Sequence, residues 1–192
     1  MTEIEIRGQL SPKKFNQLFK LLTESGQISN HYHRLSIDLS AGFDPLKKTW
    51  ENPTGVDIRL KKSDNHEKIT LKIGNYHELE RKEIEIKLQT GQFLNALEML
   101  EVMGYQNGMV YFWESWEFDY LGTEIKLSKY TDDYFIFEIE GKINTNVNDI
   151  AKKLSLTPYT EDQYRHSIDW QNQNIHHLYS KDLVNKYLQE NF

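Results

Sequence analysis

The sequence of 192 residues contains no cysteine, so disulfide bonds and thiolate metal sites are excluded. A chain without cysteine suits a reducing compartment, and we expect the protein to be cytoplasmic. No apolar run approaches the roughly 20 residues of a membrane-spanning helix, and the charged N-terminus does not have the pattern of a signal peptide. We therefore expect no membrane partner.

An excess of basic residues is also absent. The formal net charge of −6 and the pI near 5.7 argue against binding to DNA, which requires a basic face. The sequence has neither a glycine-rich phosphate-binding loop nor an ordered set of Ser, His and Asp residues for nucleophilic catalysis. Any phosphate site must therefore be a local cluster of charged side chains.

One alternating pattern occurs three times. The segments are EIEIRG at 3–8, EIEIK at 83–87 and FEIEGK at 137–142. Strict alternation of charged and apolar residues is typical of a β-strand, whose successive side chains point to opposite faces of the sheet. Each segment therefore predicts a strand with one charged face and one apolar face.

The rest of the chain predicts two halves with the same order of elements, namely a strand, a helix and three strands. The first helix has Ser11 as its N-cap, Pro12 at its first position and Gly26 beyond its end, and the second covers 91–103. The predicted strands are 3–8, 33–40, 56–62, 68–74, 83–88, 109–118, 123–130 and 133–142. Further helices are predicted at 147–154, 161–170 and 180–188, whereas His176 and His177 lie in a polar segment and should be solvated.

We interpret this pattern as an α+β fold, with a closed antiparallel β-barrel of about eight strands and helices packed outside. We expect one domain over 1–192, with a core at 1–145 and a helical part at 146–192. If the apolar faces meet the helices, the charged faces line a tunnel. Grouped carboxylates suit Mg²⁺ or Mn²⁺, and clustered Arg and Lys suit phosphate oxygens, so the tunnel predicts a metal–polyphosphate site.

Five segments, in this order, resemble the motifs of the CYTH family of triphosphate tunnel metalloenzymes. That family includes class IV adenylate cyclases, thiamine triphosphatases and inorganic triphosphatases. The matching segments are EIEIR at 3–7, IRLKK at 58–62, ITLK at 69–72, RKEIE at 81–85 and FEIEG at 137–141. One such motif alone is weak, but five in the family's order are specific.

The resemblance implies a role for each matching charged residue. The implied metal ligands are Glu3, Glu5, Glu138 and Glu140. The implied triphosphate-binding residues are Arg7, Arg59, Lys61, Lys72 and Arg81. Glu83 and Glu85 would hold a second metal ion or the attacking water.

The chain also departs from the family pattern. Trp113, Glu114 and Ser115 stand where the family has Lys-x-Arg, and Ser128 stands where it has an aspartate. Arg34 and Lys126 share the charged faces of their strands, so they are the candidates to replace the missing bases. Trp113 also shares that face, where it would stack on an organic part of the substrate or fill space.

The function that the residues and the resemblance imply is metal-dependent hydrolysis of inorganic, nucleoside or thiamine triphosphate. One alternative is an adenylate cyclase that uses the same metal site. Another is a degenerate tunnel that binds polyphosphate or a phosphorylated ligand without turnover. The sequence leaves the formation of a homodimer open.

Overall fold

The computed structural model describes residues 3–39, 41–50, 56–64, 66–74, 82–142 and 146–192. The protein has an α+β fold with an antiparallel sheet of about eight strands and five helices. Its chain divides into two compact units, which are described separately below. Unit 1 contains 1–32 and 113–166, and unit 2 contains 33–112 and 167–192.

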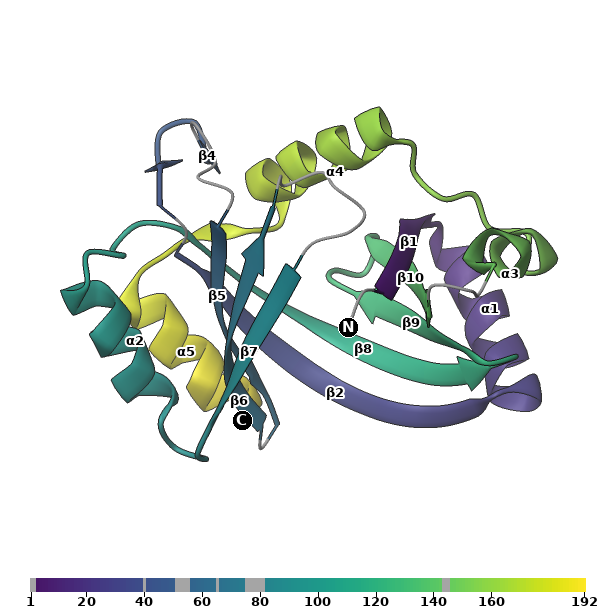
Figure 1. Cartoon of the computed structure of the whole chain (residues 1–192), viewed down its shortest axis with the longest axis horizontal. Coiled ribbons are helices and arrows are strands. Elements are labelled where there is room, and N and C mark those ends of the chain that lie inside the picture. Colours follow the sequence, from purple (N-terminus) through teal and green to yellow (C-terminus); the bar gives the residue numbers. More distant parts are fainter. Residues whose placement is uncertain (1–2, 40, 51–55, 65, 75–81, 143–145) are drawn as a thin grey trace. The chain divides into compact units, whose positions relative to one another are not determined.

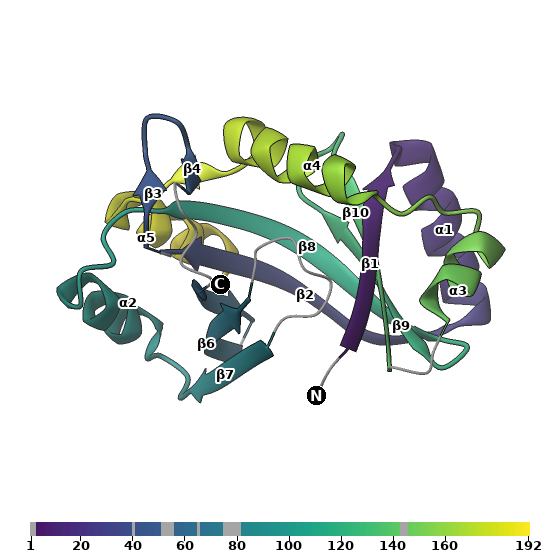
Figure 2. The ribbon, with the colours of Figure 1, turned by 45° about the horizontal axis from the view of Figure 1, so that its top comes forward.

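Unit 1 consists of a sheet and the helices on its apolar face. Strands β1 (Glu3–Leu10), β10 (Phe135–Lys142), β9 (Thr123–Lys129) and β8 (Met109–Tyr120) pair antiparallel in that order, and β2 (Gln27–Asp38) follows β8. Helices α1 (Pro12–Ser25) and α3 (Val147–Lys153) lie side by side in Figures 1 and 2. Helix α4 (Glu161–Asn174) begins in this unit.

The core of unit 1 lies between α1, α3 and one face of the sheet. Phe118, Ile125, Phe137 and Ile139 are fully buried there, together with Leu22 of α1. Because strand side chains alternate, Glu117 of β8, Lys126 of β9, and Glu138 and Glu140 of β10 lie on the opposite face. The predicted separation of an apolar and a charged face is therefore found in this unit.

Unit 2 has the same design. Strand β8 is followed by β2, β5 (Val56–Ser63), β6 (His66–Ile73) and β7 (Lys82–Leu88), and the pairs from β2 to β7 are antiparallel. Its helices are α2 (Phe93–Val102), the second part of α4 from Ser167 on, and α5 (Lys181–Asn191). Three short elements complete it, namely a hairpin of β3 (Phe43–Asp44) and β4 (Thr49–Trp50), and β11 (His177–Leu178), which pairs with β8.

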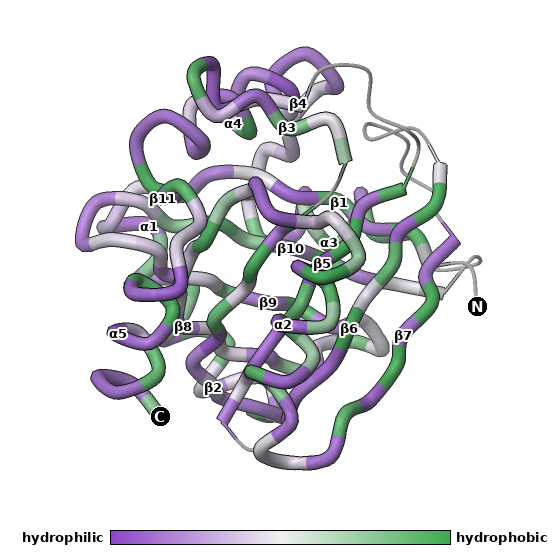
Figure 3. Tube along the Cα trace, turned by 90° about the vertical axis from the view of Figure 1, so that its left-hand side faces the viewer, coloured by the Kyte–Doolittle hydropathy of each residue, from purple (hydrophilic) through white to green (hydrophobic). Residues whose placement is uncertain are grey.

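The core of unit 2 contains buried residues of the sheet and of both helices. Leu35, Ile37 and Leu60 pack there with Leu97 of α2 and Val184 of α5. Figure 3 shows the alternation of hydrophobic and hydrophilic residues along β7. The face opposite this core carries most of the charged residues of β2, β5, β6 and β7, whereas the ion pair of Lys62 and Glu67 lies on the core side.

The two sequence halves exchange partners in the fold. Strand β1 and helix α1 of the first half pack with β8, β9 and β10 of the second half in unit 1. Strand β7 and helix α2 of the second half pack with β2, β5 and β6 of the first half in unit 2. Each unit therefore contains the strand and helix of one half and the three strands of the other.

Most predicted elements are confirmed within one to six residues at their ends. The largest difference is β2, which begins at Gln27 rather than at residue 33, because the strand continues through Ser29 and Asn30, residues that favour turns. Closure of the sheet into a barrel and the single-domain organisation of 1–192 stay predictions. No helix in the described part of the chain is long and apolar enough to cross a membrane.

The predicted start of α1 is confirmed, and it gives a test of local stability. The Ser11 side chain accepts a hydrogen bond from the Lys14 backbone N–H at 3.2 Å, and Pro12 occupies the first helical position. Ser11→Ala should lower the free energy of unfolding by about 1 kcal/mol. Urea unfolding measures this loss, and an unchanged midpoint would contradict the cap assignment.

Candidate functional site

A row of carboxylates crosses the charged face of unit 1. Glu5 of β1 lies directly opposite Glu140 of β10, which lies opposite Glu124 of β9. The next residue across the sheet is Asp119 of β8. Like charges directly opposite each other on adjacent strands are destabilising, so this row has a strong requirement for a cation.

Lysine 126 supplies positive charge to these carboxylates. Its Nζ lies 3.3 Å from Glu140, 3.5 Å from Glu124, 3.6 Å from Glu138 and 3.8 Å from Glu117. Burial alone would lower the pKa of Lys126, but the surrounding carboxylates outweigh burial and hold it well above its ordinary value. Lys126 is on the charged face, as predicted, and its contacts are with carboxylates.

A second row contains alternating charges two residues further along the strands. Arg7 lies opposite Glu138, Glu138 opposite Lys126, and Lys126 opposite Glu117. Arg7 forms ion pairs with Glu5 and with Glu138, the latter at 3.3 Å, and its guanidinium lies 5.0 Å from the centre of the Tyr164 ring. The buried Tyr32 hydroxyl donates a hydrogen bond of 2.7 Å to Glu117, which continues this row into β2.

The carboxylate oxygens of unit 1 are the type of ligand that Mg²⁺ and Mn²⁺ prefer. Burial raises the pKa of Glu140, Lys126 offsets part of this, and Glu5, Glu138 and Glu124 raise it further. Among the described residues, no three His, Asp or Glu side chains are gathered as a coordination shell. The ion pairs of Lys126 and Arg7 hold these carboxylates instead.

The positions where the chain departs from the family pattern form a neutral patch. Ser115 and Ser128 are cross-strand partners, both are buried, and their hydroxyls hydrogen bond at 2.7 Å. Trp113 is 8% exposed and stacks on Tyr130 with ring centres 5.5 Å apart. One face of the indole is therefore already covered, which favours the interpretation that Trp113 fills space.

The charged face of unit 2 is mainly basic. Lys61 of β5 lies opposite Lys68 of β6, which lies opposite Lys87 of β7. Two residues away in register, Arg59 lies opposite Thr70. Positive charges so close together repel one another, and an anion relieves that repulsion.

Lysine 61 shows the repulsion most clearly. Burial lowers the pKa of Lys61 well below its ordinary value, and the positive charges of Arg59, Lys72 and Arg34 lower it further, whereas Glu83 acts in the opposite direction. All four cations were predicted to bind triphosphate. The structure brings them together on one face.

Replacement of Lys61 gives a test with two readouts. Lys61→Met removes a destabilised charge and keeps the aliphatic stem, so the unliganded protein should gain about 0.5–2 kcal/mol of stability. The same variant should bind inorganic tripolyphosphate about tenfold more weakly. Thermal unfolding and calorimetric titration measure these effects, and a variant that loses stability while binding normally would contradict the assignment.

Arginine 59 is held by two buried carboxylates. Its Nε and Nη2 donate to the two oxygens of Asp57 at 2.9 and 2.6 Å, and its Nε lies 3.6 Å from Asp38. Asp38 and Asp57 are each 2% exposed. The bidentate contact fixes the plane of the guanidinium, so the orientation of Arg59 is set before any ligand binds.

The predicted catalytic carboxylates are on the same face as the cations. Lys72 Nζ lies 3.3 Å from Glu83, and Lys68 forms an ion pair with Glu85. Burial would raise the pKa of Glu83, but Lys72 and Lys61 lower it below its ordinary value, so this carboxylate is ionised at neutral pH. Arg81 and the side chain of Glu3 lie outside the described residues.

Several residues of the two charged faces were given no role from the sequence. Alternation alone placed Asp38 and Asp57 on the charged face, and the same parity gives Glu117. The prediction for His176 was wrong, because this residue is 9% exposed and stacks on Tyr111 with ring centres 4.1 Å apart. His177 is exposed as predicted, and no local periodicity distinguishes the two histidines.

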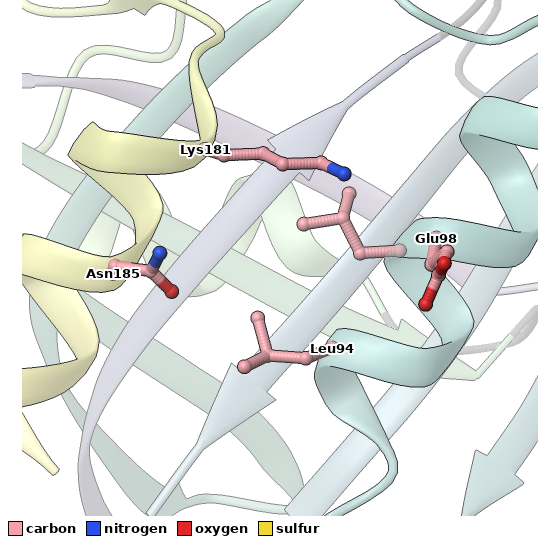
Figure 4. Close-up of a pocket in the computed structure, with 5 residues that line it drawn as sticks. Leu94, Glu98, Lys181 and Asn185 are labelled. Carbon is pink, nitrogen blue, oxygen red and sulfur yellow. The ribbon is translucent and has the colours of Figure 1, made fainter.

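A pocket of about 180 Å³ lies between α2 and α5 in unit 2. Figure 4 shows Leu94 and Glu98 of α2 facing Lys181 and Asn185 of α5. The pocket is smaller than the roughly 300–1,000 Å³ of typical ligand sites, and none of its lining residues is on a charged sheet face. The candidate sites are therefore the two charged faces, each within its own unit, rather than this pocket.

No protein-family model and no curated protein sequence matches the chain. Solved structures with a similar fold do match. The PH1012 protein of Pyrococcus horikoshii OT3 gives a TM-score of 0.64 at 16% identity, covering 81% of this chain and 91% of that chain.

Two further structures carry functional descriptions. A candidate adenylate cyclase from Vibrio parahaemolyticus gives a TM-score of 0.54 at 12% identity and covers 97% of this chain and 98% of that chain. The second is HpAC1 from Hippeastrum, a candidate adenylyl cyclase described as having a dominant triphosphatase activity. It gives a TM-score of 0.55 at 14% identity and covers 82% of this chain and 90% of that chain. At these identities the likeness establishes a shared fold.

Proposed function

We propose that this protein is a divalent-metal-dependent hydrolase of a triphosphate substrate. The observation that carries the proposal is the cluster of Arg34, Arg59, Lys61 and Lys72 on one sheet face, with the pKa of Lys61 depressed by its cationic neighbours. Such a cluster suits a polyanion. The descriptions of the structural neighbours from Vibrio parahaemolyticus and Hippeastrum support the same chemistry, as do the five motifs that resemble the CYTH family.

The cations of unit 2 would bind the phosphate chain. Arg59 is oriented by Asp57 and Asp38, so little side-chain entropy is lost when it contacts a phosphate oxygen. Lys61 and Lys72 add positive charge next to it and would stabilise the charge spread over the transferred phosphoryl oxygens. Arg34 would extend the same surface, and Arg81, which lies outside the described residues, stays a predicted phosphate-binding residue. The expected closure of the sheet into a tunnel belongs to this proposal.

The carboxylates of unit 1 would hold Mg²⁺ or Mn²⁺. The ligands from this chain would be Glu5, Glu138 and Glu140, and Glu3, whose side chain lies outside the described residues, stays a predicted ligand. When bound, the metal ion polarises phosphate oxygens and lowers the pKa of coordinated water. Arg7 and Lys126 would neutralise those carboxylates that do not contact the metal.

The two glutamates of β7 would orient the attacking water. Glu83 is ionised at neutral pH, so it can accept a hydrogen bond from water and take up its proton during attack. Glu85 lies two residues along the same strand face and would act in the same way or complete the hydrogen bonds of the water.

One alternative has specific support. The Vibrio and Hippeastrum proteins are described as candidate cyclases, and a cyclase would need only a ribose 3′-hydroxyl in place of water as nucleophile. The neutral patch at Ser115 and Ser128 favours a second alternative, a module that binds polyphosphate without turnover.

A substrate screen tests the proposal. The purified protein is incubated with tripolyphosphate, ATP and thiamine triphosphate, with Mg²⁺, with Mn²⁺ and with a chelator. Metal-dependent release of inorganic phosphate supports hydrolysis, whereas cyclic nucleotide with pyrophosphate identifies a cyclase. Tight tripolyphosphate binding without turnover identifies the binding module, and a protein that neither binds nor hydrolyses any of the three substrates would refute the proposal.

A further inference from the structure

His176, which was predicted from the sequence to be solvated, lies beside the basic face of unit 2. His176 follows α4 and is 9% exposed, and its ring stacks on Tyr111 of β8 at a centre distance of 4.1 Å. The electrostatic neighbours of the Tyr111 hydroxyl are Arg59, Ser36, Asp38 and Asp57, and Ser36 is the cross-strand partner of Lys61. His176 is therefore on the same side of the sheet as Arg59 and Lys61.

The hydrogen bonds of His176 define its two ring nitrogens. Nδ1 lies 2.8 Å from the Oδ1 atom of the buried Asn172, so it carries the hydrogen when that oxygen accepts. Nε2 then has a lone pair. Nε2 is buried and has no hydrogen-bond partner within the part of the chain that the structure describes.

A second orphan polar atom lies on the same face. The Thr70 hydroxyl is fully buried and has no hydrogen-bond partner among the described residues. Thr70 is the cross-strand partner of Arg59. Buried polar atoms without partners are rare in folded proteins, and each calls for a ligand or a water. Two such atoms in the neighbourhood of one arginine indicate a binding position.

We propose that His176 is a ligand-binding residue, whose Nε2 takes up a proton from solvent and donates it in a hydrogen bond to a phosphate oxygen held by Arg59. The inference rests on the proposed function and extends it, because His176 lies outside the motifs that resemble the CYTH family. One proton is therefore taken up by the protein when a phosphate chain binds.

The electrostatics of the site favour proton uptake by His176 only when an anion is bound. In the unliganded protein, burial, Arg59, His177 and Lys48 together lower the pKa of His176 to about 3, so the imidazole is neutral at neutral pH. The charged and titratable groups around it are Arg59 of β5 with its partners Asp38 and Asp57, Lys48 of the β3–β4 hairpin, the adjacent His177 and the neutral Tyr111 of β8. A bound phosphate reverses the local potential and raises this pKa, so affinity should increase as the pH falls through the bound-state value.

Calorimetric titration with tripolyphosphate tests the proposal without divalent metal, so that no hydrolysis occurs. The titration is done at about pH 6, close to the ordinary pKa of histidine, in buffers of different ionisation enthalpy, which gives the number of protons taken up. His176→Gln should lower this number by up to about one proton and weaken binding about tenfold. His166→Gln, at an exposed histidine of α4 that is not among the groups acting on His176, should leave both values unchanged.

Each outcome decides the matter. If wild type binds and His176→Gln binds with equal affinity and equal proton uptake, His176 is only a core residue and the proposed function stands. If wild type does not bind tripolyphosphate, the proposed function itself fails. Should His176→Gln not fold, the assigned imidazole ¹⁵N resonances of wild-type His176 replace it, and a pKa that does not rise on addition of tripolyphosphate overturns the inference.

Discussion

Glu140→Gln is expected to reduce triphosphate hydrolysis about 100-fold or more, because it removes a carboxylate from the centre of the proposed metal-binding set. Glu140 lies opposite both Glu5 and Glu124, so its charge is repelled from both sides. Phosphate release from tripolyphosphate under saturating Mg²⁺ measures the effect. Glu24→Gln, at an exposed glutamate of α1, is the matched control.

The same variant should not lose stability. The pKa of Glu140 is raised in the folded protein, so its ionised form lowers stability at neutral pH. Glu140→Gln should therefore unfold at an equal or higher temperature at pH 7, and the gain should disappear as the pH falls below about 4, where the unfolded chain is also protonated. A destabilised variant, or one that retains turnover, would contradict the assignment of Glu140.

Arg59→Met is expected to have the largest effect on stability. Asp38 and Asp57 are buried and depend on Arg59 for compensation, so its removal should cost about 3–5 kcal/mol. Tripolyphosphate affinity should fall at least about tenfold. Chemical unfolding and calorimetric titration measure the two losses.

A double variant separates these effects. Arg59→Met with Asp57→Asn removes one of the uncompensated carboxylates, so it should recover part of the stability without recovering affinity. Lys13→Met, at an exposed lysine of α1, controls for loss of charge alone. If the double variant regains affinity together with stability, Arg59 supports the fold and does not contact phosphate.

The strands were predictable because alternation is a property of the sequence itself. The polar parity of Arg59, Lys61 and Lys72 identified one charged face, and that of Glu5, Glu138 and Glu140 identified the other. Helix α1 was predictable because Ser11, Pro12 and Gly26 mark its ends. The hairpin of β3 and β4 was missed because two-residue strands have no period to detect.

The partners of the charged residues were less predictable. Alternation assigns Lys126 to a face, but only the register of β8, β9 and β10 surrounds it with four carboxylates. The pairing of Arg59 with Asp38 depends on the register of β2 and β5. His176 was assigned wrongly because its burial comes from contacts with Tyr111 and Asn172, which no local pattern of sequence encodes.

The exchange of partners between the sequence halves has a consequence for how the chain folds. The hairpins β5–β6 and β8–β9 join neighbouring segments, and they can form with little loss of loop entropy. In contrast, β1 finds its partner only after β10, at the far end of the second half, has been made. Pairing of β1 therefore closes the longest loop in unit 1, and topology of this kind slows folding. The carboxylates of Glu5 and Glu140 come together in that late step, so the proposed metal-binding face should be among the last parts of the protein to acquire its native geometry.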